Sequence, residues 1–306
     1  MLKTGLCIVL FALAAGCAPK QKPLTDYVNP LLGTATLWDS VDLGFKPTKR
    51  TWGAEVFPGS SLPNAMVQVS PVTKFHSGAG YQYEDSVIYG FTHTNKGHWN
   101  LCHIPLLPVT GTPLPGDYCS PYSHARESAA PGYYRDFLDR YGVDVELTAT
   151  KRVGLHKYTF PASQEAAVVF DLENGGCWDK ATETAFVSDG LRLSGYRYST
   201  GWAKDQRVYF TAEFSKPVKN ISYPDASETV PEEGDVTVKG RYARVEFDTT
   251  DGEPLYMKVA ISPVSIENAK LNMQAELPGW DFEATAAAAD KAWNAELQKV
   301  RVETAD

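Results

Sequence analysis

The sequence lacks an excess of basic residues, which excludes the concentrated positive surface that nucleic-acid binding requires. Its 306 residues include 29 lysines and arginines against 37 aspartates and glutamates, and the formal net charge is −8. Proteins that bind DNA or RNA use clustered lysines and arginines to neutralise phosphates. We therefore expect no nucleic acid among the partners of this protein.

Cysteine is also scarce, and its spacing argues against a zinc site built on thiolates. No Cys-x-x-Cys pair occurs, and Cys7 and Cys17 lie in an N-terminal leader. The remaining cysteines are Cys102, Cys119 and Cys177. An odd number allows at most one disulfide bond among them. Cys102 and Cys119 are nearest in sequence, and buried free thiols are the alternative. A Gly-x-Ser-x-Gly motif is absent too, so the sequence gives no sign of a serine nucleophile.

The apolar run nearest the N-terminus is too short to cross a membrane. It covers residues 6–15, follows Lys3 and ends in small residues, which is typical of an export signal. Residues 13–17 read Leu-Ala-Ala-Gly-Cys and resemble a bacterial lipoprotein cleavage site. Residues 1–17 are thus predicted to be a signal peptide, with Cys17 as the lipidated N-terminus and the lipid as the only membrane anchor. Secretion without a lipid is the alternative.

Residues 18–27 form a short polar segment after Cys17 and are predicted to be a tether. The tether is basic rather than acidic, so it lacks the acidic tract associated with display on the outer face of the outer membrane. We therefore expect the protein in the bacterial cell envelope, on the periplasmic face rather than the cell surface.

Short β-branched and aromatic runs dominate the middle of the chain. They occur at residues 157–161, 166–172 and 191–198, between clusters of Gly, Asn and Asp. Strict alternation of apolar and polar residues follows at 208–214, 244–248 and 257–261. Such spacing predicts a mainly β fold, an antiparallel β-sandwich over residues 28–277. Long helices do not alternate with these strands, which excludes a doubly wound sheet. Ser70 and Pro71 are expected to set a turn.

The C-terminal part changes to a helical period. Apolar residues recur at steps of three and four, at Phe282, Ala286, Ala289, Trp293, Leu297 and Val300. This pattern predicts one amphipathic helix within residues 278–306. A helix with an apolar stripe must pack either on the sandwich or on another domain.

Residues 52–111 combine many Gly, Pro, His and Trp residues with strand-like runs. Their motifs are Phe57-Pro58-Gly59, then Pro63, Met66-Val67-Gln68 and Ser70-Pro71, then Tyr81, Tyr83 and Asp85, then Gly90-Phe91 and His93-Thr94. These motifs resemble the N-terminal domain of family 92 glycoside hydrolases, the calcium-dependent exo-acting α-mannosidases. Residues 146–161, 194–217 and 258–302 also look like sequence of this family.

The resemblance implies a sandwich of the galactose-mutarotase-like type, joined by the C-terminal helix to a larger (α/α)₆ domain that this chain lacks. Family members are inverting enzymes, and their catalytic carboxylates and most calcium ligands lie in that helical domain. No catalytic or metal-ligating residue is therefore assigned to this chain. The expected partners are a mannose-containing glycan, such as mannan or an N-glycan, and the helical domain. The fragment alone is expected to bind sugar weakly and to hydrolyse nothing.

The sandwich can supply one wall of a sugar pocket. Amide, imidazole and indole groups suit a sugar, because they combine hydrogen bonds with an aromatic platform. The loop at residues 92–103 concentrates such groups. The predicted substrate-binding residues are His93, Asn95, His98, Trp99, Trp52, Glu55 and Trp202. Two alternatives remain from the residues alone: a stand-alone carbohydrate-binding envelope lipoprotein without hydrolase activity, and a structural envelope sandwich without a ligand.

Overall fold

The computed structural model describes residues 22–37, 44–45, 53–95, 101–113, 116–232, 234–300 and 302. The predicted lipidation site Cys17 and three predicted sugar-binding residues, Trp52, His98 and Trp99, lie outside the described residues.

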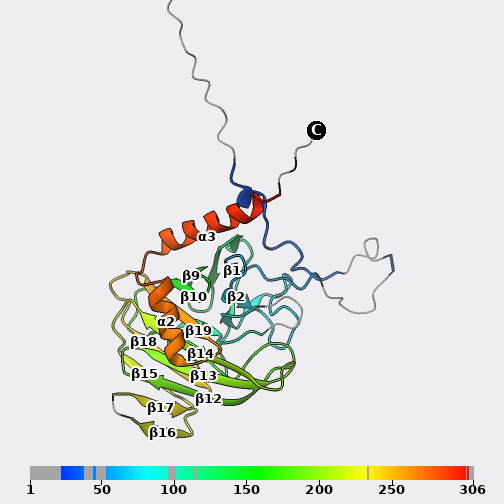
Figure 1. Ribbon diagram of the computed structural model, residues 1–306. Coiled ribbons are helices and arrows are strands. Elements are labelled where there is room, and N and C mark those ends of the chain that lie inside the picture. Colours follow the sequence, from blue (N-terminus) through cyan, green and yellow to red (C-terminus); the bar gives the residue numbers. More distant parts are fainter. Residues whose placement is uncertain are drawn as a thin grey trace, which may run out of the picture.

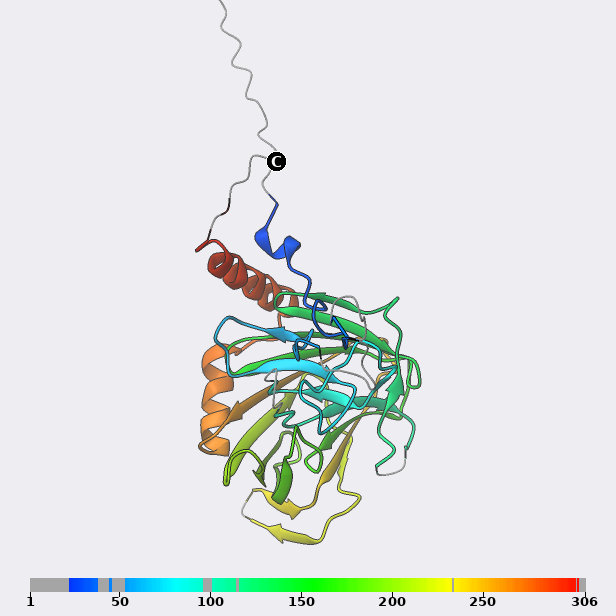
Figure 2. The ribbon, with the colours of Figure 1, turned by 90° about the vertical axis from the view of Figure 1, so that its right-hand side faces the viewer.

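Two antiparallel sheets form the body of the described chain (Figures 1 and 2). The strand order of the first is β1 (Ser60–Ser61), β2 (Gln68–Val72), β4 (Gly90–Thr92), β5 (Leu106–Thr110), β11 (Ala166–Asp171), β18 (Tyr242–Phe247), β15 (Asn220–Ser222). The order of the second is β16 (Glu228–Pro231), β17 (Val236–Lys239), β12 (Lys180–Ser188), β13 (Leu193–Thr200), β14 (Gln206–Phe214), β19 (Leu255–Ser262), β10 (Val153–Thr159), β9 (Val143–Ala149), β8 (Tyr133–Leu138), β7 (Ser128–Ala130). A separate small pair joins β3 (Val87–Ile88) to β6 (Ser120–Pro121).

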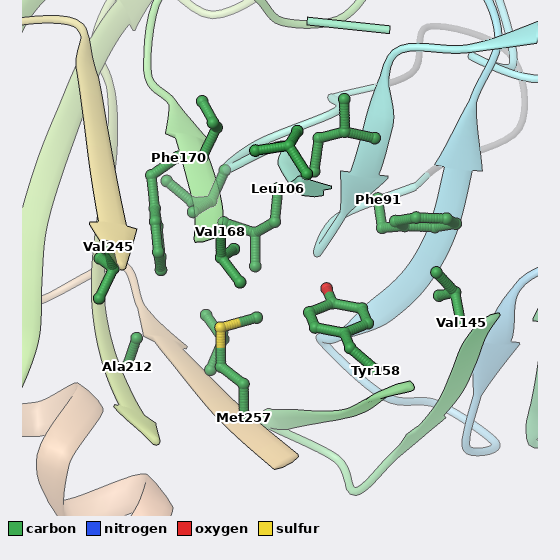
Figure 3. Close-up of a cluster of buried hydrophobic side chains, with 14 of the residues drawn as sticks. Phe91, Leu106, Val145, Tyr158, Val168, Phe170, Ala212, Val245 and Met257 are labelled. Carbon is green, nitrogen blue, oxygen red and sulfur yellow. The ribbon is translucent and has the colours of Figure 1, made fainter. Parts of the chain in front are cut away.

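The core lies between the two large sheets. Figure 3 shows Phe91, Leu106 and Phe170 from the first sheet meeting Tyr158 and Met257 from the second, and all of them are buried. Since side chains alternate between the two faces of a strand, a run with a period of two places every second residue in this layer. The prediction of a mainly β, antiparallel sandwich is confirmed.

Helix α2 (Ile266–Glu276) covers part of the outer face of the second sheet. Ser265 begins the helix, because its side chain accepts a hydrogen bond from the backbone N–H of Asn268. Ala269 and Met273 are buried against Leu155, which points away from the main core. The sequence analysis missed this helix, because only two of its residues are buried and its apolar stripe is correspondingly weak.

Glu276 ties the end of α2 to the turn between β9 and β10. Its carboxylate accepts hydrogen bonds from Thr150 Oγ1 at 2.6 Å, the Arg152 backbone N–H at 2.9 Å and Arg152 Nε at 2.5 Å. Burial acts to raise the pKa of Glu276, but these hydrogen bonds and the Arg152 charge outweigh it, so the pKa is lowered. The ionised carboxylate therefore stabilises this contact.

Helix α3 (Phe282–Leu297) lies along one end of the sandwich, beyond β9 (Figure 1). Asp281 caps its first turn by accepting a backbone hydrogen bond. Phe282 and Ala289 are buried, and Trp293 donates a hydrogen bond from Nε1 to Ser61 O at 2.6 Å. The helix thus packs on the sandwich, which is one of the two expected arrangements. Its role as a linker to a helical domain stays a prediction.

The observed helix is shorter than expected, and Val300 is not part of it. The helix ends at Leu297, and Val300 is 74% exposed. The short helix η1 (Leu24–Tyr27) lies beside α3, because Asn294 Oδ1 accepts a hydrogen bond from the Leu24 backbone N–H at 2.7 Å (Figure 2). Residues near the two ends of the described chain therefore lie at the same end of the molecule.

Two expectations need correction. Ser70 and Pro71 belong to strand β2 rather than to a turn, and Pro71 pairs with Phe91 of β4. Proline is tolerated there because β1 pairs only with residues 68 and 69, so no described strand needs a hydrogen bond from position 71 on that side. Cys102 and Cys119 do not form a disulfide bond; both are thiols, as is Cys177, and Cys102 is buried.

No helix among the described residues is long and apolar enough to cross a membrane.

Candidate sugar-binding site

A hollow of about 260 Å³ lies between residues 34–36 and 53–55, the loop after β2 and the loop after β11. Polar and aromatic groups converge on it. Its lining includes Thr36, Glu55, Lys74, His76, Ser77, Tyr81, Gln82, Cys177 and Trp178. Opposite charges, hydrogen-bonding side chains and one indole therefore share a single small cavity.

The backbone around this hollow is strained. Glu55, His76 and Trp178 have φ angles of 53°, 56° and 59°, the left-handed region that residues with a side chain rarely adopt. They are half of the six non-glycine residues with positive φ that the structure describes. Strained backbone persists where the surrounding structure imposes it, and it concentrates at functional sites. The cluster of strained residues therefore marks this hollow as a candidate site.

Gln82 presents an unused hydrogen-bond acceptor. Its Oε1 is buried and has no hydrogen-bond partner among the described residues, although the side chain lines the hollow. A buried polar atom without a partner costs about 1–3 kcal/mol. A ligand that donates a hydrogen bond, such as a sugar hydroxyl, would remove that cost if the side chain turned Oε1 toward it, since Oε1 is closed to solvent in this structure.

His76 joins two walls of the hollow. Its Nδ1 lies 3.0 Å from Gly176 O, and its backbone N–H donates to Gly175 O at 3.3 Å. A carbonyl oxygen can only accept, so Nδ1 carries the proton in this contact. The neutral ring then offers Nε2 as an acceptor.

Glu55 and Cys177 lie near each other across the hollow. Burial raises the pKa of the Cys177 thiol, and the negative charge of Glu55 raises it further. Gly78 leaves room for the Glu55 carboxylate, because a Cβ on residue 78 would lie only 2.3 Å from Glu55 Oε1. The thiol therefore stays protonated near neutral pH, as a weak hydrogen-bond donor rather than a nucleophile.

A buried ion pair fixes the loop that carries Cys177 and Trp178. Arg197 of β13 is 1% exposed and pairs with Asp179. It also donates from Nε to Leu172 O at 2.8 Å and from Nη2 to Glu173 O at 3.2 Å. These contacts hold both sides of the loop at residues 172–179, which forms one wall of the hollow.

His93 does not lie at a surface, and its predicted contact with sugar is wrong for this structure. The ring is fully buried, with Nδ1 2.9 Å from Ile104 O and Nε2 2.9 Å from Nε2 of His156. Burial lowers the pKa of His93 to about 4, although the hydrogen bond to Ile104 opposes this. His93 is thus a neutral residue of the core.

Asn95 is also buried, so its predicted role in direct sugar binding is corrected too. Its Nδ2 donates to Gln68 O at 2.9 Å and to Thr92 Oγ1 at 2.9 Å, and its backbone N–H donates to Gln68 Oε1. The side chain fixes the start of the loop instead of facing solvent. Nearby His103 is buried as well, and burial together with the charge of Arg197 lowers its pKa to about 3.

Two other predicted residues lie at or beside the hollow. Glu55 lines it, and Trp202 stacks on Trp178 with ring centroids 6.3 Å apart and 28° between the planes. Glu55 and Trp202 therefore lie at or beside the hollow, whereas His93 and Asn95 are buried elsewhere.

Sequence reasoning missed Gln82, His76, Cys177 and Trp178. Gln82 lies between Tyr81 and Tyr83, which belong to one of the motifs that resemble family 92. Cys177 and Trp178 directly follow Gly175 and Gly176. The signal that could have pointed to Cys177 and Trp178 was a tryptophan two positions after a glycine pair.

No group of three or more His, Cys, Asp or Glu side chains among the described residues is arranged to hold a metal ion. Several acidic residues near the hollow have local roles: Glu84 accepts hydrogen bonds from the backbone and side chain of Thr36, and Asp85 accepts one from Thr73.

Comparison with family models gives a consistent match along the chain. A model described as the glycosyl hydrolase family 92 N-terminal domain matches residues 27–262. A second, described as the catalytic domain of the same family, matches residues 268–306. No curated protein matches the chain.

Similar solved structures include two mannosidases from Bacteroides thetaiotaomicron. The family GH92 α-mannosidase BT3965 is 30% identical, with a TM-score of 0.80; the match covers 94% of this chain and 39% of that one. The family GH92 inverting mannosidase BT2199 is 26% identical, with a TM-score of 0.76, and the match covers 94% and 38%. The chain thus spans less than two-fifths of the length of either protein.

Proposed function

The chain belongs to glycosyl hydrolase family 92 and carries its N-terminal domain, and on this premise we propose that the hollow around Gln82 is one wall of a mannose pocket. In the complete protein this pocket would serve an exo-acting, inverting α-mannosidase that removes terminal mannose from a glycan. The observation that carries the proposal is the buried, unpartnered Gln82 Oε1 among strained residues.

The lining of the hollow supplies what a sugar ring needs. Gln82 Oε1 and the Glu55 carboxylate accept hydrogen bonds from hydroxyls, and the Lys74 ammonium donates them. The Trp178 indole offers an apolar face for the C–H groups of the ring. The volume of about 260 Å³ lies just below the range of about 300–1,000 Å³ for small-molecule sites, which suits one sugar ring rather than a long chain.

Hydrolysis with inversion requires a general acid and a general base on opposite sides of the sugar. We assign neither to this chain, and place both in the helical catalytic domain. Calcium belongs to the same proposal: its ligands would come mostly from that domain, because no described cluster of carboxylates here fits the oxygen-rich shell that calcium prefers. What this chain contributes is binding and orientation of the terminal sugar.

Protection of Cys177 tests the binding proposal. In a Cys119→Ser background, Cys177 is the half-buried thiol and Cys102 is fully buried, so iodoacetamide reports on the hollow. Methyl α-mannoside should slow alkylation of Cys177, measured by mass spectrometry, and methyl α-galactoside should not. Gln82→Leu should weaken protection about fivefold, since one hydrogen bond contributes about 1 kcal/mol. Gln164→Leu, at an exposed position, is the control. Alkylation at the same rate with and without the mannoside would contradict the proposal.

The proposal also separates binding from catalysis. Purified protein with this sequence should release no mannose from an aryl α-mannoside, with or without calcium. Calcium-dependent release by this chain would show that the catalytic groups lie within it. Binding without hydrolysis even when the rest of the gene product is supplied would instead favour a carbohydrate-binding lipoprotein.

We further propose that Cys17 is lipidated and anchors the protein to the periplasmic face of the envelope. The support is the sequence of residues 13–17 and the basic tether that follows. Metabolic labelling with a palmitate analogue should mark the wild-type protein and not Cys17→Ser. External protease applied to intact cells should leave the protein uncut, and cleavage would place it at the cell surface.

A further inference from the structure

Two exposed tryptophans stand beside the candidate mannose pocket. Trp178 is 59% exposed and lines the pocket, and Trp202 is 71% exposed on the turn between β13 and β14. Their rings are stacked, with centroids 6.3 Å apart and 28° between the planes. The aromatic surface therefore continues from the pocket outward along the molecule.

The two turns that carry these tryptophans are held together by backbone contacts and by an ion pair. Trp178 has a left-handed backbone, with φ at 59°, directly before Asp179, which pairs with the buried Arg197. Gly201 brings the second turn close, because a Cβ there would lie 2.8 Å from Trp178 O. The turn closes through a hydrogen bond from Gly201 N to Ala203 O at 2.9 Å. A fixed platform loses little conformational entropy when a ligand binds.

The surroundings of the platform are polar. Exposed Lys204, Asp205 and Arg207 follow Trp202 in the sequence, and Arg207 donates a hydrogen bond from Nε to Asp205 Oδ1 at 3.1 Å. An apolar ring face bordered by charged donors and acceptors matches a pyranose, whose C–H groups and hydroxyls alternate around the ring. A purely apolar partner would remove water from these charged groups at a cost in free energy.

We propose that Trp178 and Trp202 form a platform for a second sugar ring, the one to which the terminal mannose is linked. Trp178 belongs to both the pocket and the platform, so the two surfaces are continuous. A ring attached to a sugar in the pocket therefore reaches Trp202. The inference rests on the proposed mannose pocket, and it makes the platform a determinant of which glycan is accepted.

The experiment compares two kinds of ligand on four proteins by isothermal titration calorimetry. The ligands are methyl α-mannoside, with one ring, and α-linked mannobioses of each linkage, with two. The proteins are the wild type, Trp202→Ala, Gly201→Ala and Leu191→Ala. Gly201→Ala keeps both indoles but forces the turns apart, since its new Cβ meets backbone atoms. Leu191→Ala removes a 74% exposed apolar side chain from the turn at the opposite end of β13 and is the matched control.

The readout is the ratio of the association constants for the best mannobiose and for methyl α-mannoside. Stacking of one ring should give the wild type a ratio of about three to ten. Trp202→Ala should bring the ratio to about one, Gly201→Ala should reduce it, and Leu191→Ala should leave it as in the wild type.

An unchanged ratio in Trp202→Ala, or a wild-type ratio near one, would overturn the platform and leave the pocket intact. Packing of Trp202 on another protein domain predicts that unchanged ratio. A ratio that depends on Trp202 while methyl α-mannoside fails to protect Cys177 would keep the platform and reject the proposed pocket. Binding of neither ligand by the wild type would reject both.

Discussion

A buried hydrogen-bond chain, His93–His156–Tyr158, makes the effect of one mutation depend on pH. Ile104 O can only accept, so His93 Nδ1 donates to it, and His93 Nε2 then accepts from Nε2 of His156 at 2.9 Å. Nδ1 of His156 accepts from the Tyr158 hydroxyl at 2.8 Å. All three side chains are buried. His156→Leu would leave the Tyr158 hydroxyl and His93 Nε2 without partners, which should cost about 2–4 kcal/mol at pH 7.5.

The loss of unfolding free energy caused by His156→Leu should become smaller at acidic pH. Burial, and then the neighbouring His93, lowers the pKa of His156 well below its ordinary value near 6.5. The folded protein therefore keeps His156 neutral while the unfolded chain takes up a proton below pH 6.5. Stability supplied by the neutral ring is complete above that pH and falls by about 1.4 kcal/mol per pH unit below it. Between pH 6.5 and pH 5.0 the wild type should lose about 2 kcal/mol that His156→Leu, which has no such group, keeps.

Urea unfolding followed by tryptophan fluorescence, at pH 7.5, 6.5, 5.5 and 5.0, measures this difference. Leu147→Ala is the matched control, because Leu147 pairs with His156 across β9 and β10, is fully buried and cannot titrate. Its destabilisation should stay constant with pH. A His156→Leu difference that is equal at pH 7.5 and pH 5.0 would refute the assignment of a neutral, buried His156.

Three further predictions concern the elements around the core. Gly132→Ala should destabilise the protein by about 1–3 kcal/mol in thermal unfolding, because Gly132 has φ at 82° and its Cβ would lie 2.6 Å from the Cβ of Ala289 on α3. Arg197→Met should cost about 3–5 kcal/mol in urea unfolding by leaving Asp179 buried without its partner, and Arg197→Met with Asp179→Asn should recover part of the loss; no recovery would argue against the pair. Glu276→Gln should cost about 1 kcal/mol at pH 7, since the carboxylate is partly exposed and screened. Because the folded pKa of Glu276 is lowered, that cost should vanish as pH falls through the folded pKa, and a constant difference down to pH 3 would contradict it.

The sandwich was predictable because its signal is local. Val208, Phe210 and Ala212 alternate with Tyr209, Thr211 and Glu213 in the sequence and are buried in β14, as a strand with one core face requires. Helix α2 was not predictable by the same means, because its contact with the sheet buries only Ala269 and Met273. A helix with so short an apolar stripe is stabilised mainly by packing on the sheet, and the spacing of its apolar residues does not reveal that packing.

The site was predictable only in part, because residue type does not indicate the direction of a side chain. His93 and Glu55 were both reasonable sugar ligands by chemistry. The pairing of β2 with β4 turns His93 into the sandwich, whereas a left-handed backbone places Glu55 in the hollow. Gln82 gave no signal in the sequence, since a glutamine becomes a candidate ligand only when its Oε1 is found buried without a partner.

The sequence by itself determined the class of fold and the family, because hydrophobic periodicity and short motifs are properties of neighbouring residues. Only the tertiary structure decided which polar residues meet. Gln82, His76 and Trp178 come from two loops nearly a hundred residues apart, joined by the hydrogen bonds of His76 to Gly175 and Gly176. The loops follow β2 and β11, which belong to the same sheet with β4 and β5 between them, so the contact depends on strand order and loop path, and no window of the sequence contains both of its partners.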